Sequence, residues 1–334
     1  MLKKLTLYLF VFATSAVPAL AGVIVNSPGA NSQVGSPFNL SAYASQCSGQ
    51  NVSAMGYSLD SSTNTTIVYS SSINTSVSVP TGGHTLHVKA WGNGGAVCVT
   101  DVAIIVSTFS IVPQYAASVS SIQALGNWVA QNDSASSGSA SGSMSITSSP
   151  SLSGAARRFA TSYWNYGSER YSATFADDMG AHNFLFDVWV NLASPSTGIA
   201  NLEFDLNQVV SNGTMLYGFQ CDGWSGTWDF TVNRGTATNF SDQWVHSSAP
   251  CNVRTWGTNQ WHHVQISYSR NDSGWITYKS VWLDGHRNDI NVTAFGIFSL
   301  GWSPTLLVNV QVDGSQSGSG SSVVYVDNLI VYRW

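Results

Sequence analysis

Two acidic side chains in one short segment could take part in carbohydrate chemistry. The segment reads Leu202-Glu203-Phe204-Asp205-Leu206-Asn207-Gln208. On a β-strand its apolar residues face one side, while Glu203, Asp205 and Asn207 face the other. Carboxylates and amides on one face can bind the hydroxyl groups of a sugar. With a suitable second carboxyl group, Glu203 and Asp205 could also be catalytic residues in the hydrolysis of a glycosidic bond.

An aromatic and polar segment follows this strand. It begins Phe219-Gln220-Cys221-Asp222-Gly223-Trp224 and continues through Trp228 and Trp244. Sugars pack their C–H faces on aromatic rings and hydrogen-bond to amide and carboxylate side chains. The ligand-binding residues expected from both segments are Glu203, Asp205, Asn207, Gln220, Asp222, Trp224, Trp228 and Trp244.

The composition limits the elements that could position these residues. Of the 334 residues, 12% are aromatic and 9% are charged, which excludes a disordered chain because disorder requires few aromatic residues and a high net charge. The 12 Lys and Arg residues against 17 Asp and Glu residues leave no basic surface for a nucleic acid. Only Trp91 of the 13 tryptophans precedes residue 127, so the aromatic residues belong to the later part of the chain.

The first residues have the features of a secretory signal peptide. Lys3 and Lys4 precede an apolar stretch, and Ala19-Leu20-Ala21 forms a small-residue cleavage site, so residues 1–21 are expected to be removed on export. No later run approaches the roughly 20 apolar residues of a membrane span. The sequence thus predicts a secreted protein, extracellular, periplasmic or on the cell surface, and leaves its oligomeric state open.

Export makes the four cysteines candidates for disulfide bonds. Four cysteines allow three pairings, and we expect Cys47–Cys98 and Cys221–Cys251 because each pair stays within one predicted domain. A zinc site is the competing interpretation, but no Cys-x-x-Cys or close Cys/His spacing supports it.

The chain divides into two predicted β domains joined by a connector. Residues 22–108 alternate short β-branched runs with turn residues, which is typical of a small β-sandwich. Residues 109–121 are expected to be the connector. Residues 122–334 contain longer apolar runs without helical periodicity, which predicts a double-sheet jelly roll. The Ser/Gly-rich stretch 134–149 is expected to be a loop within this second domain.

The first predicted domain resembles the Ig-like modules of secreted bacterial proteins. The similarity rests on Val25-Asn26-Ser27-Pro28, on Tyr57-Ser58-Leu59-Asp60, and on Gly83-His84-Thr85-Leu86 before the strand that ends at Trp91. The resemblance implies an Ig-like β-sandwich with a spacing or adhesion role.

The second predicted domain resembles the concanavalin A-like lectin/glucanase superfamily. The similarity rests on Trp261-His262-His263-Val264, on Trp282-Leu283-Asp284-Gly285, and on Tyr325-Val326-Asp327-Asn328 near the end of the chain. The resemblance implies a concanavalin A-like jelly-roll β-sandwich. It does not select an activity, because this fold supports lectins, hydrolases, lyases and adhesion modules.

The segment around Glu203 is similar to the E-x-D-x-(x)-E motif of laminarinase-type glycoside hydrolases. In that family the first Glu is the nucleophile, the Asp supports it and the last Glu is the acid/base. Here the last position holds Asn207 or Gln208, and neither amide can deliver a proton to a leaving group. Hydrolysis would need another acid, and the candidates are Asp187, Asp222 and Asp229.

Binding of an extracellular polysaccharide or glycan is therefore the leading functional expectation. Hydrolysis with Glu203 as nucleophile is the alternative, and adhesion or structural packing without a small ligand is a third. A lyase would need a His or Tyr base, for which the candidate residues are His182, His262, His263 and Tyr217, with Gln220 beside them.

No cofactor is expected. A structural calcium ion is the one metal considered, because carboxylate and amide oxygens occur in turns at Asp284-Gly285, Asp313-Gly314 and Asp327-Asn328.

Overall fold

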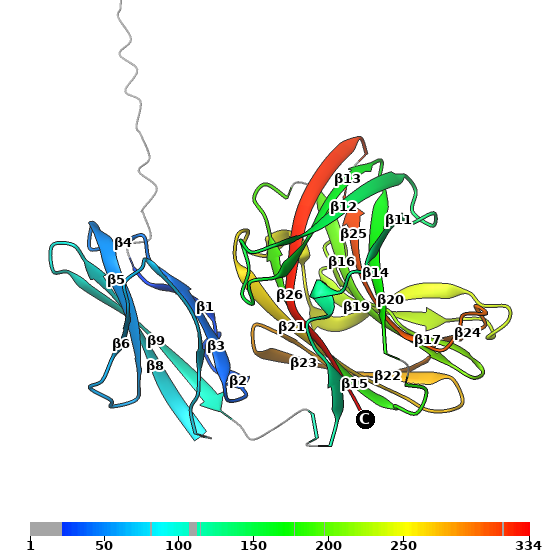
Figure 1. Ribbon diagram of the computed structural model, residues 1–334, viewed down its shortest axis with the longest axis horizontal. Helices are drawn as coiled ribbons and strands as arrows, with labels where there is room; N and C mark the ends of the chain where they lie inside the picture. Colours follow the sequence, from blue (N-terminus) through cyan, green and yellow to red (C-terminus); the bar gives the residue numbers. More distant parts are fainter. Residues whose placement is uncertain are drawn as a thin grey trace, which may run out of the picture.

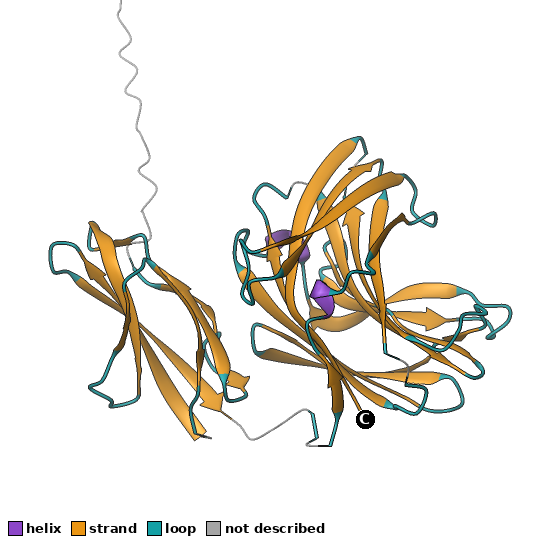
Figure 2. Ribbon diagram, in the orientation of Figure 1, coloured by secondary structure: helices purple, strands orange, loops and turns teal. Residues whose placement is uncertain are grey.

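The computed structural model describes residues 22–334 apart from residue 81, residues 107–111, and residues 114, 177, 197 and 316. The described chain is all-β and is arranged as two β-sandwiches (Figures 1 and 2). Its short 3₁₀ helices are η1 (Ile122–Ala124) and η2 (Val253–Thr255). The predicted signal peptide, residues 1–21, lies outside the described residues. Among the described residues, no helix has the length and hydropathy needed to cross a membrane.

The first domain consists of two sheets that pack around a shared apolar core. One sheet has the order β1 (Ile24–Ser27), β3 (Phe38–Tyr43), β7 (Ser72–Val77). The other has the order β2 (Ser32–Val34), β9 (Val97–Val106), β8 (Gly82–Gly92), β5 (Gln50–Leu59), β4 (Gln46–Cys47), with β6 (Thr66–Val68) paired to β5. Alternation in β8 explains this packing, because Leu86, Val88 and Ala90 are fully buried and share one face of the strand.

The second domain consists of two larger sheets. The back sheet has the order β12 (Ser139–Thr147), β13 (Ala156–Trp164), β26 (Ser319–Arg333), β15 (Asn183–Leu192), β21 (Trp261–Arg270), β22 (Trp275–Leu283), β23 (His286–Phe295), with β10 (Ala117–Val119) paired to β26. The front sheet has the order β11 (Val129–Asn132), β14 (Ser168–Phe175), β25 (Leu306–Gly314), β16 (Ile199–Val210), β18 (Phe219–Asp222), β19 (Thr227–Asn233), β20 (Asp242–Pro250). Two further strands, β17 (Gly213–Tyr217) and β24 (Ile297–Phe298), continue from β16.

The core of the second domain lies between its front and back sheets. Phe204 of the front sheet and Phe186 of the back sheet are both fully buried, with ring centroids 6.3 Å apart. One face of each sheet is thereby committed to the core, and only the outer faces can meet a ligand or another domain.

Both expected disulfides are present, Cys47–Cys98 in the first domain and Cys221–Cys251 in the second.

Two sequence expectations about this region are corrected. The connector predicted over residues 109–121 ends earlier, because β10 pairs with β26 and belongs to the back sheet; residues 109–111 and 114 lie outside the described part of the chain. The Ser/Gly-rich stretch 134–149 contains strand β12 rather than only a loop. Its small residues pair along β13, and Ala140 and Met144 pack against the core, so a polar composition here belongs to an edge strand.

The first domain lies against the outer face of the back sheet (Figure 1). Its strand β2 contacts the β22–β23 turn, where Gly285 approaches Ser32. A cavity of about 1010 Å³ lies between the two domains and is lined by residues of both. The outer face of the front sheet is therefore on the side of the second domain that the first domain does not contact.

Candidate functional site

Strand β16 turns the predicted acidic residues away from the core. Its fully buried apolar residues are Leu202, Phe204 and Leu206. Because side chains alternate along a strand, Glu203, Asp205 and Asn207 point to the outer face of the front sheet, as the sequence predicted.

Strand register extends this polar pattern across the front sheet. Glu203 lies opposite Gln311 of β25 on one side and Gln220 of β18 on the other, and directly opposed residues share a face. The same pairing continues outward on both sides. The resulting line of side chains from β11 to β20, called here the polar row, is Gln131, Arg170, Gln311, Glu203, Gln220, Asp229 and His246.

Hydrogen bonds connect the members of the polar row. The Gln311 amide donates to Glu203 Oε1 at 2.8 Å and to Asp313 Oδ1 at 3.2 Å. Arg170 donates to Gln131 Oε1 at 3.1 Å. These contacts hold the side chains of β25, β16 and β14 in fixed positions along the sheet.

The central residues of the polar row are buried, and the polar residues around them are partly exposed. Glu203 is 5% exposed and Gln220 3%, although neither belongs to the core. Asp205, Arg170 and Asp313 remain partly exposed. Two tryptophans near the polar row stay accessible to solvent: Trp224 is 55% exposed and Trp244 is 37% exposed.

Trp244 and Trp224 reach the site from different elements. Trp244 of β20 lies opposite Thr231, two residues from the Asp229–His246 pair, so it shares their face. Trp224 lies in the turn between β18 and β19, where the Arg254 guanidinium packs over its ring at 5.2 Å. The ring of Tyr166 lies 6.1 Å from Trp224.

Burial raises the pKa of the carboxyl groups in and beside the polar row. Burial raises the pKa of the Glu203 carboxyl well above its usual value, and the carboxyls of Asp313 and Asp205 raise it further. Burial likewise raises the pKa of Asp205 to about 7 and that of Asp313 to about 6. Burial therefore favours the protonated form of Glu203, in which the carboxyl can donate a hydrogen bond as well as accept one.

Asp205 is held by the backbone. Its Oδ1 accepts a hydrogen bond from the Phe219 amide at 3.1 Å, where the chain enters β18. This contact fixes the carboxyl beside Glu203 on the same face.

The structure brings most of the predicted ligand-binding residues to one face. Glu203, Asp205, Gln220 and Asp222 lie on β16 and β18, with Trp224 and Trp244 beside them. Asn207 points to the same face but is only 2% exposed.

The expectation that Trp228 contacts a ligand is wrong. Trp228 lies opposite Cys221, and that register places it on the core side of β19. It is fully buried, with its ring stacked on Phe219 at 5.3 Å between centroids. The residues on either side of it, Thr227 and Asp229, face outward.

The acids proposed as partners of Glu203 divide between the sheets. Asp222 and Asp229 lie on the outer face of the front sheet, whereas Asp187 lies on the back sheet and accepts a hydrogen bond from Gln265 at 2.7 Å. His263 is 2.7 Å from Asp187, so this pair is remote from the polar row.

The remaining lyase candidates also lie away from the polar row. His262 contacts Asp284 at 2.8 Å in the back sheet, and His182 contacts Asp272 at 2.9 Å. Tyr217 is fully buried and donates to Gln208.

The turns considered for calcium lie in different parts of the second domain. Asp284 accepts from the His263 amide in the β22–β23 turn. Asp327 accepts from the Leu152 and Ser153 amides, and Asp313 lies beside Glu203. Calcium binding stays a prediction.

Sequence reasoning missed the residues that complete the polar row on its other side. Gln131, Arg170 and Gln311 come from strands far from β16 in the sequence. A signal was present for Gln311, because Val308-Asn309-Val310-Gln311-Val312-Asp313 alternates apolar and polar residues just as β16 does.

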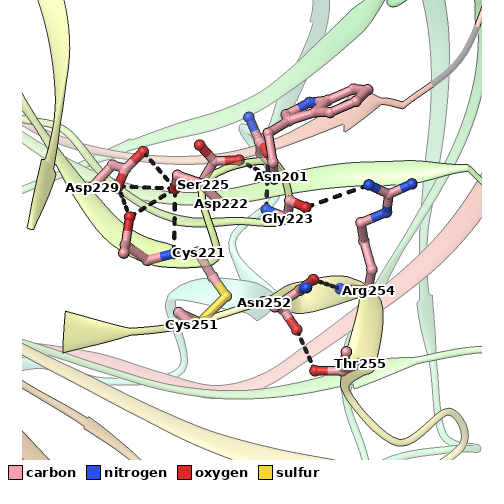
Figure 3. The surroundings of a disulfide bond; sticks show 12 residues. Asn201, Cys221, Asp222, Gly223, Ser225, Asp229, Cys251, Asn252, Arg254 and Thr255 are labelled. Atoms are coloured by element: carbon pink, nitrogen blue, oxygen red, sulfur yellow. Dashed lines mark hydrogen bonds between the residues drawn. A yellow bond between two sulfur atoms is a disulfide. The ribbon is translucent and has the colours of Figure 1, made fainter. Parts of the chain in front are cut away.

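Hydrogen bonds order the β18–β19 turn next to the Cys221–Cys251 disulfide (Figure 3). Figure 3 shows Asp222 and Asp229 on one side of the β18–β19 turn with Ser225 near both, and the disulfide on the other side. Asp222 Oδ1 accepts from the Trp224 amide at 2.6 Å, and Thr227 donates to Asp229 at 2.6 Å. The left-handed backbone of Gly226, with φ 74°, closes this turn.

No protein-family model and no curated protein matches the sequence. Among solved structures, a carbohydrate-binding module of the β-sandwich superfamily is similar over 92% of this chain and 96% of its own, at 11% identity and a TM-score of 0.33. A carbohydrate esterase from a Shiga toxin-encoding bacteriophage covers 65% of this chain and 98% of its own, at 12% identity and a TM-score of 0.34. Lectin II from Ulex europaeus covers 65% and 99%, at 14% identity and a TM-score of 0.31. At these TM-scores the similarities carry no argument about the activity of this chain.

Proposed function

We propose that the second domain binds a neutral carbohydrate on the outer face of its front sheet. Exposed Trp244 and Trp224 would pack on the sugar rings, and the partly exposed groups of Asp205 and Arg170 would bind hydroxyls. The buried centre of the polar row, Glu203 and Gln311, would hold these groups in position. The predicted signal peptide, together with the two disulfides, supports an extracellular glycan as the partner.

One observation carries this proposal: a continuous line of amide, carboxyl, guanidinium and imidazole groups crosses the sheet between two exposed tryptophans. Such groups offer both donors and acceptors, as the hydroxyls of a sugar require. Aromatic rings add the flat apolar contact that sugar C–H faces require.

The charge of the face favours a neutral glycan over an acidic one. Acids outnumber bases here, since Arg170 is the cation of the polar row and His246 its imidazole. The acids are Glu203, Asp205, Asp222, Asp229 and Asp313. An anionic polysaccharide would meet more carboxyl groups than cations on this face, which costs affinity.

Affinity electrophoresis against a panel of neutral and acidic polysaccharides would test the proposal. The protein should be retarded by at least one neutral polysaccharide, and Trp244→Ala should weaken that binding about threefold to tenfold, as expected for loss of one aromatic stacking contact. Trp275→Ala is the matched control, because Trp275 is 44% exposed but lies in the back sheet. Equal retardation of the two variants would contradict the proposal.

Glycoside hydrolysis is the second candidate function, and the burial of the Glu203 carboxyl, which raises its pKa, is the observation that favours it. A carboxyl with a raised pKa suits the general acid rather than the nucleophile expected from the laminarinase resemblance. Asp229 lies in the same polar row two strands away. The usual spacing of strands places the two backbones about 10 Å apart. Inverting hydrolysis uses carboxyl groups about 6.5–9.5 Å apart.

Product analysis separates binding from hydrolysis. A polysaccharide that the protein retains would be incubated with wild-type protein and with Glu203→Gln, and new reducing ends would be measured. Reducing ends that appear with wild-type protein and not with Glu203→Gln would support hydrolysis. Binding without reducing ends in either sample would leave carbohydrate binding alone.

A further inference from the structure

Three side chains with metal-binding atoms meet at one end of the polar row. Asp222 ends β18, Asp229 lies in β19 and His246 lies in β20. One ligand atom from each lies within 4.8 Å of the other two. Within the described part of the chain, no other group of three His, Cys, Asp or Glu side chains has this spacing.

The distances within this group are close to those of a metal site. His246 Nδ1 lies 2.8 Å from Asp229 Oδ2. Zinc binds nitrogen and oxygen ligands at about 2.0–2.2 Å, which separates tetrahedral ligand atoms by about 3–3.5 Å. Small side-chain rotations would therefore suffice to place one ion among the three groups.

The two carboxyls are fixed in place before any ion binds. The Trp224 amide donates to Asp222 Oδ1, and Thr227 Oγ1 donates to Asp229 Oδ1, each at 2.6 Å. The Cys221–Cys251 disulfide holds the strand directly beside Asp222 (Figure 3). Ligands that are oriented by neighbouring groups lose little freedom on binding a metal.

The two carboxyl groups of this site are buried next to each other, and a nearby cation would stabilise them. Asp222 is 4% exposed and Asp229 fully buried, and burying two neighbouring carboxylates is costly without compensation. Asp229 has the His246 imidazole as its partner at 2.8 Å, and a bound divalent ion would place positive charge beside both carboxyls.

A buried amide next to the group gives a second, independent indication of a ligand. Gln220 is 3% exposed, and its Oε1 has no hydrogen-bond partner among the described residues. Gln220 lies directly opposite Asp229 and two residues before Asp222, so its side chain shares their face. Buried polar atoms are seldom left without a partner, and those that are need an explanation such as an ion or a water molecule.

We propose that Asp222, Asp229 and His246 bind one divalent transition-metal ion of the Zn²⁺ or Mn²⁺ type, with Gln220 Oε1 as an adjacent oxygen donor. The imidazole ligand disfavours Ca²⁺ and Mg²⁺, which prefer sites made wholly of oxygen atoms. His246 has a side chain that is 64% exposed, so the ion can enter from solvent and can keep water ligands.

Equilibrium dialysis of the full chain against Zn²⁺, Mn²⁺ or Ca²⁺, followed by metal analysis, would test this proposal. We expect one Zn²⁺ or Mn²⁺ per chain and no comparable Ca²⁺ binding. His246→Ala and Asp222→Asn should each weaken the binding more than about tenfold. His182→Ala is the matched control, because His182 forms a similar pair with Asp272 at 2.9 Å but belongs to no group of three potential ligands among the described residues.

Visible absorption of the Co²⁺-substituted protein gives a second readout that does not depend on the variants being equally stable. Wild-type protein should develop d–d bands that saturate at one Co²⁺ per chain and disappear on addition of Zn²⁺. No bound ion at micromolar metal, or binding unchanged in both His246→Ala and Asp222→Asn, would overturn the proposal. In that case the group is a hydrogen-bonded His–Asp pair with a neighbouring carboxyl.

Discussion

Glu203 is a buried carboxyl group that lies outside the hydrophobic core. It points away from the core, yet it is buried and accepts a hydrogen bond from Gln311 at 2.8 Å. Burial and the nearby Asp313 carboxyl raise its pKa, which favours the protonated form of the group. A charged Glu203 would repel the neighbouring carboxylates of Asp205 and Asp313 and would destabilise the polar row.

At the residue scale, Asp205 makes a pH dependence that can be measured. Burial raises its pKa to about 7, against about 3.9 in an unfolded chain. Between pH 4 and pH 7 the native state therefore binds more protons than the unfolded state, and stability decreases as pH rises through that window. Asp205→Asn should remove this loss and flatten the slope by up to about 1.4 kcal/mol per pH unit.

Urea unfolding at several pH values between 4.5 and 7.5, with a chelator present, measures this slope. Asp272→Asn is the control, because Arg270 and His182 lower the pKa of Asp272 and move its titration below the window. The same slope in wild-type protein and Asp205→Asn would show that Asp205 titrates normally.

At the element scale, alternation along single strands was predictable and pairing between strands was not. The outward direction of Glu203 and Asp205 follows from the period of two in β16 alone. Their neighbours Gln311 and Gln220 depend on register with β25 and β18, which local sequence does not encode. The metal-ligand group is invisible to spacing rules for the same reason, since its residues come from three separate strands.

Trp228 and Trp244 show where composition misleads. Both belong to one aromatic segment, and sequence reasoning assigned both to a ligand. Trp228 faces Cys221 on the core side, whereas Trp244 faces Thr231 on the outer side. An irregularity in the β19–β20 pairing between Thr227 and Asp229 shifts the register there, so counting residues from one tryptophan does not place the other.

The disulfides allow a prediction for each domain separately. Cys221–Cys251 closes a loop of 30 residues and Cys47–Cys98 one of 51, which correspond to about 3.5 and about 4 kcal/mol in the chain-entropy description. Replacing Cys221 and Cys251 by Ala should lower the melting temperature of the second domain. Replacing Cys47 and Cys98 by Ala should lower that of the first.

Differential scanning calorimetry would follow the two transitions in each double variant. Each variant serves as the control for the other, since its disulfide lies in the other domain. A shift of both transitions in both variants would mean that the domains unfold as one unit.

At the scale of the whole molecule, the two domains have separate cores, and the two outer faces of the second domain differ. One contacts the first domain and the other carries the polar row. The core of the first domain and that of the second have no residue in common among the described residues. The first domain lies over part of the outer face of the back sheet, where the stacked rings of Trp189 and His263 line the cavity between the domains. The hydrophobic core of the second domain separates this cavity from the polar row.

This arrangement predicts that the second domain carries the proposed binding function alone. A fragment of residues 112–334 keeps β10, both large sheets and the Cys221–Cys251 disulfide, so it should unfold cooperatively. It should also bind the same neutral polysaccharide within about twofold of the affinity of the full chain, because changes at distant independent sites couple weakly. Isothermal titration calorimetry of the fragment and the full chain measures this difference. A fragment that folds but binds much more weakly would instead place the glycan in the cavity between the domains, which is lined by Trp189 and Trp282 of the back sheet and by Phe38 of the first domain.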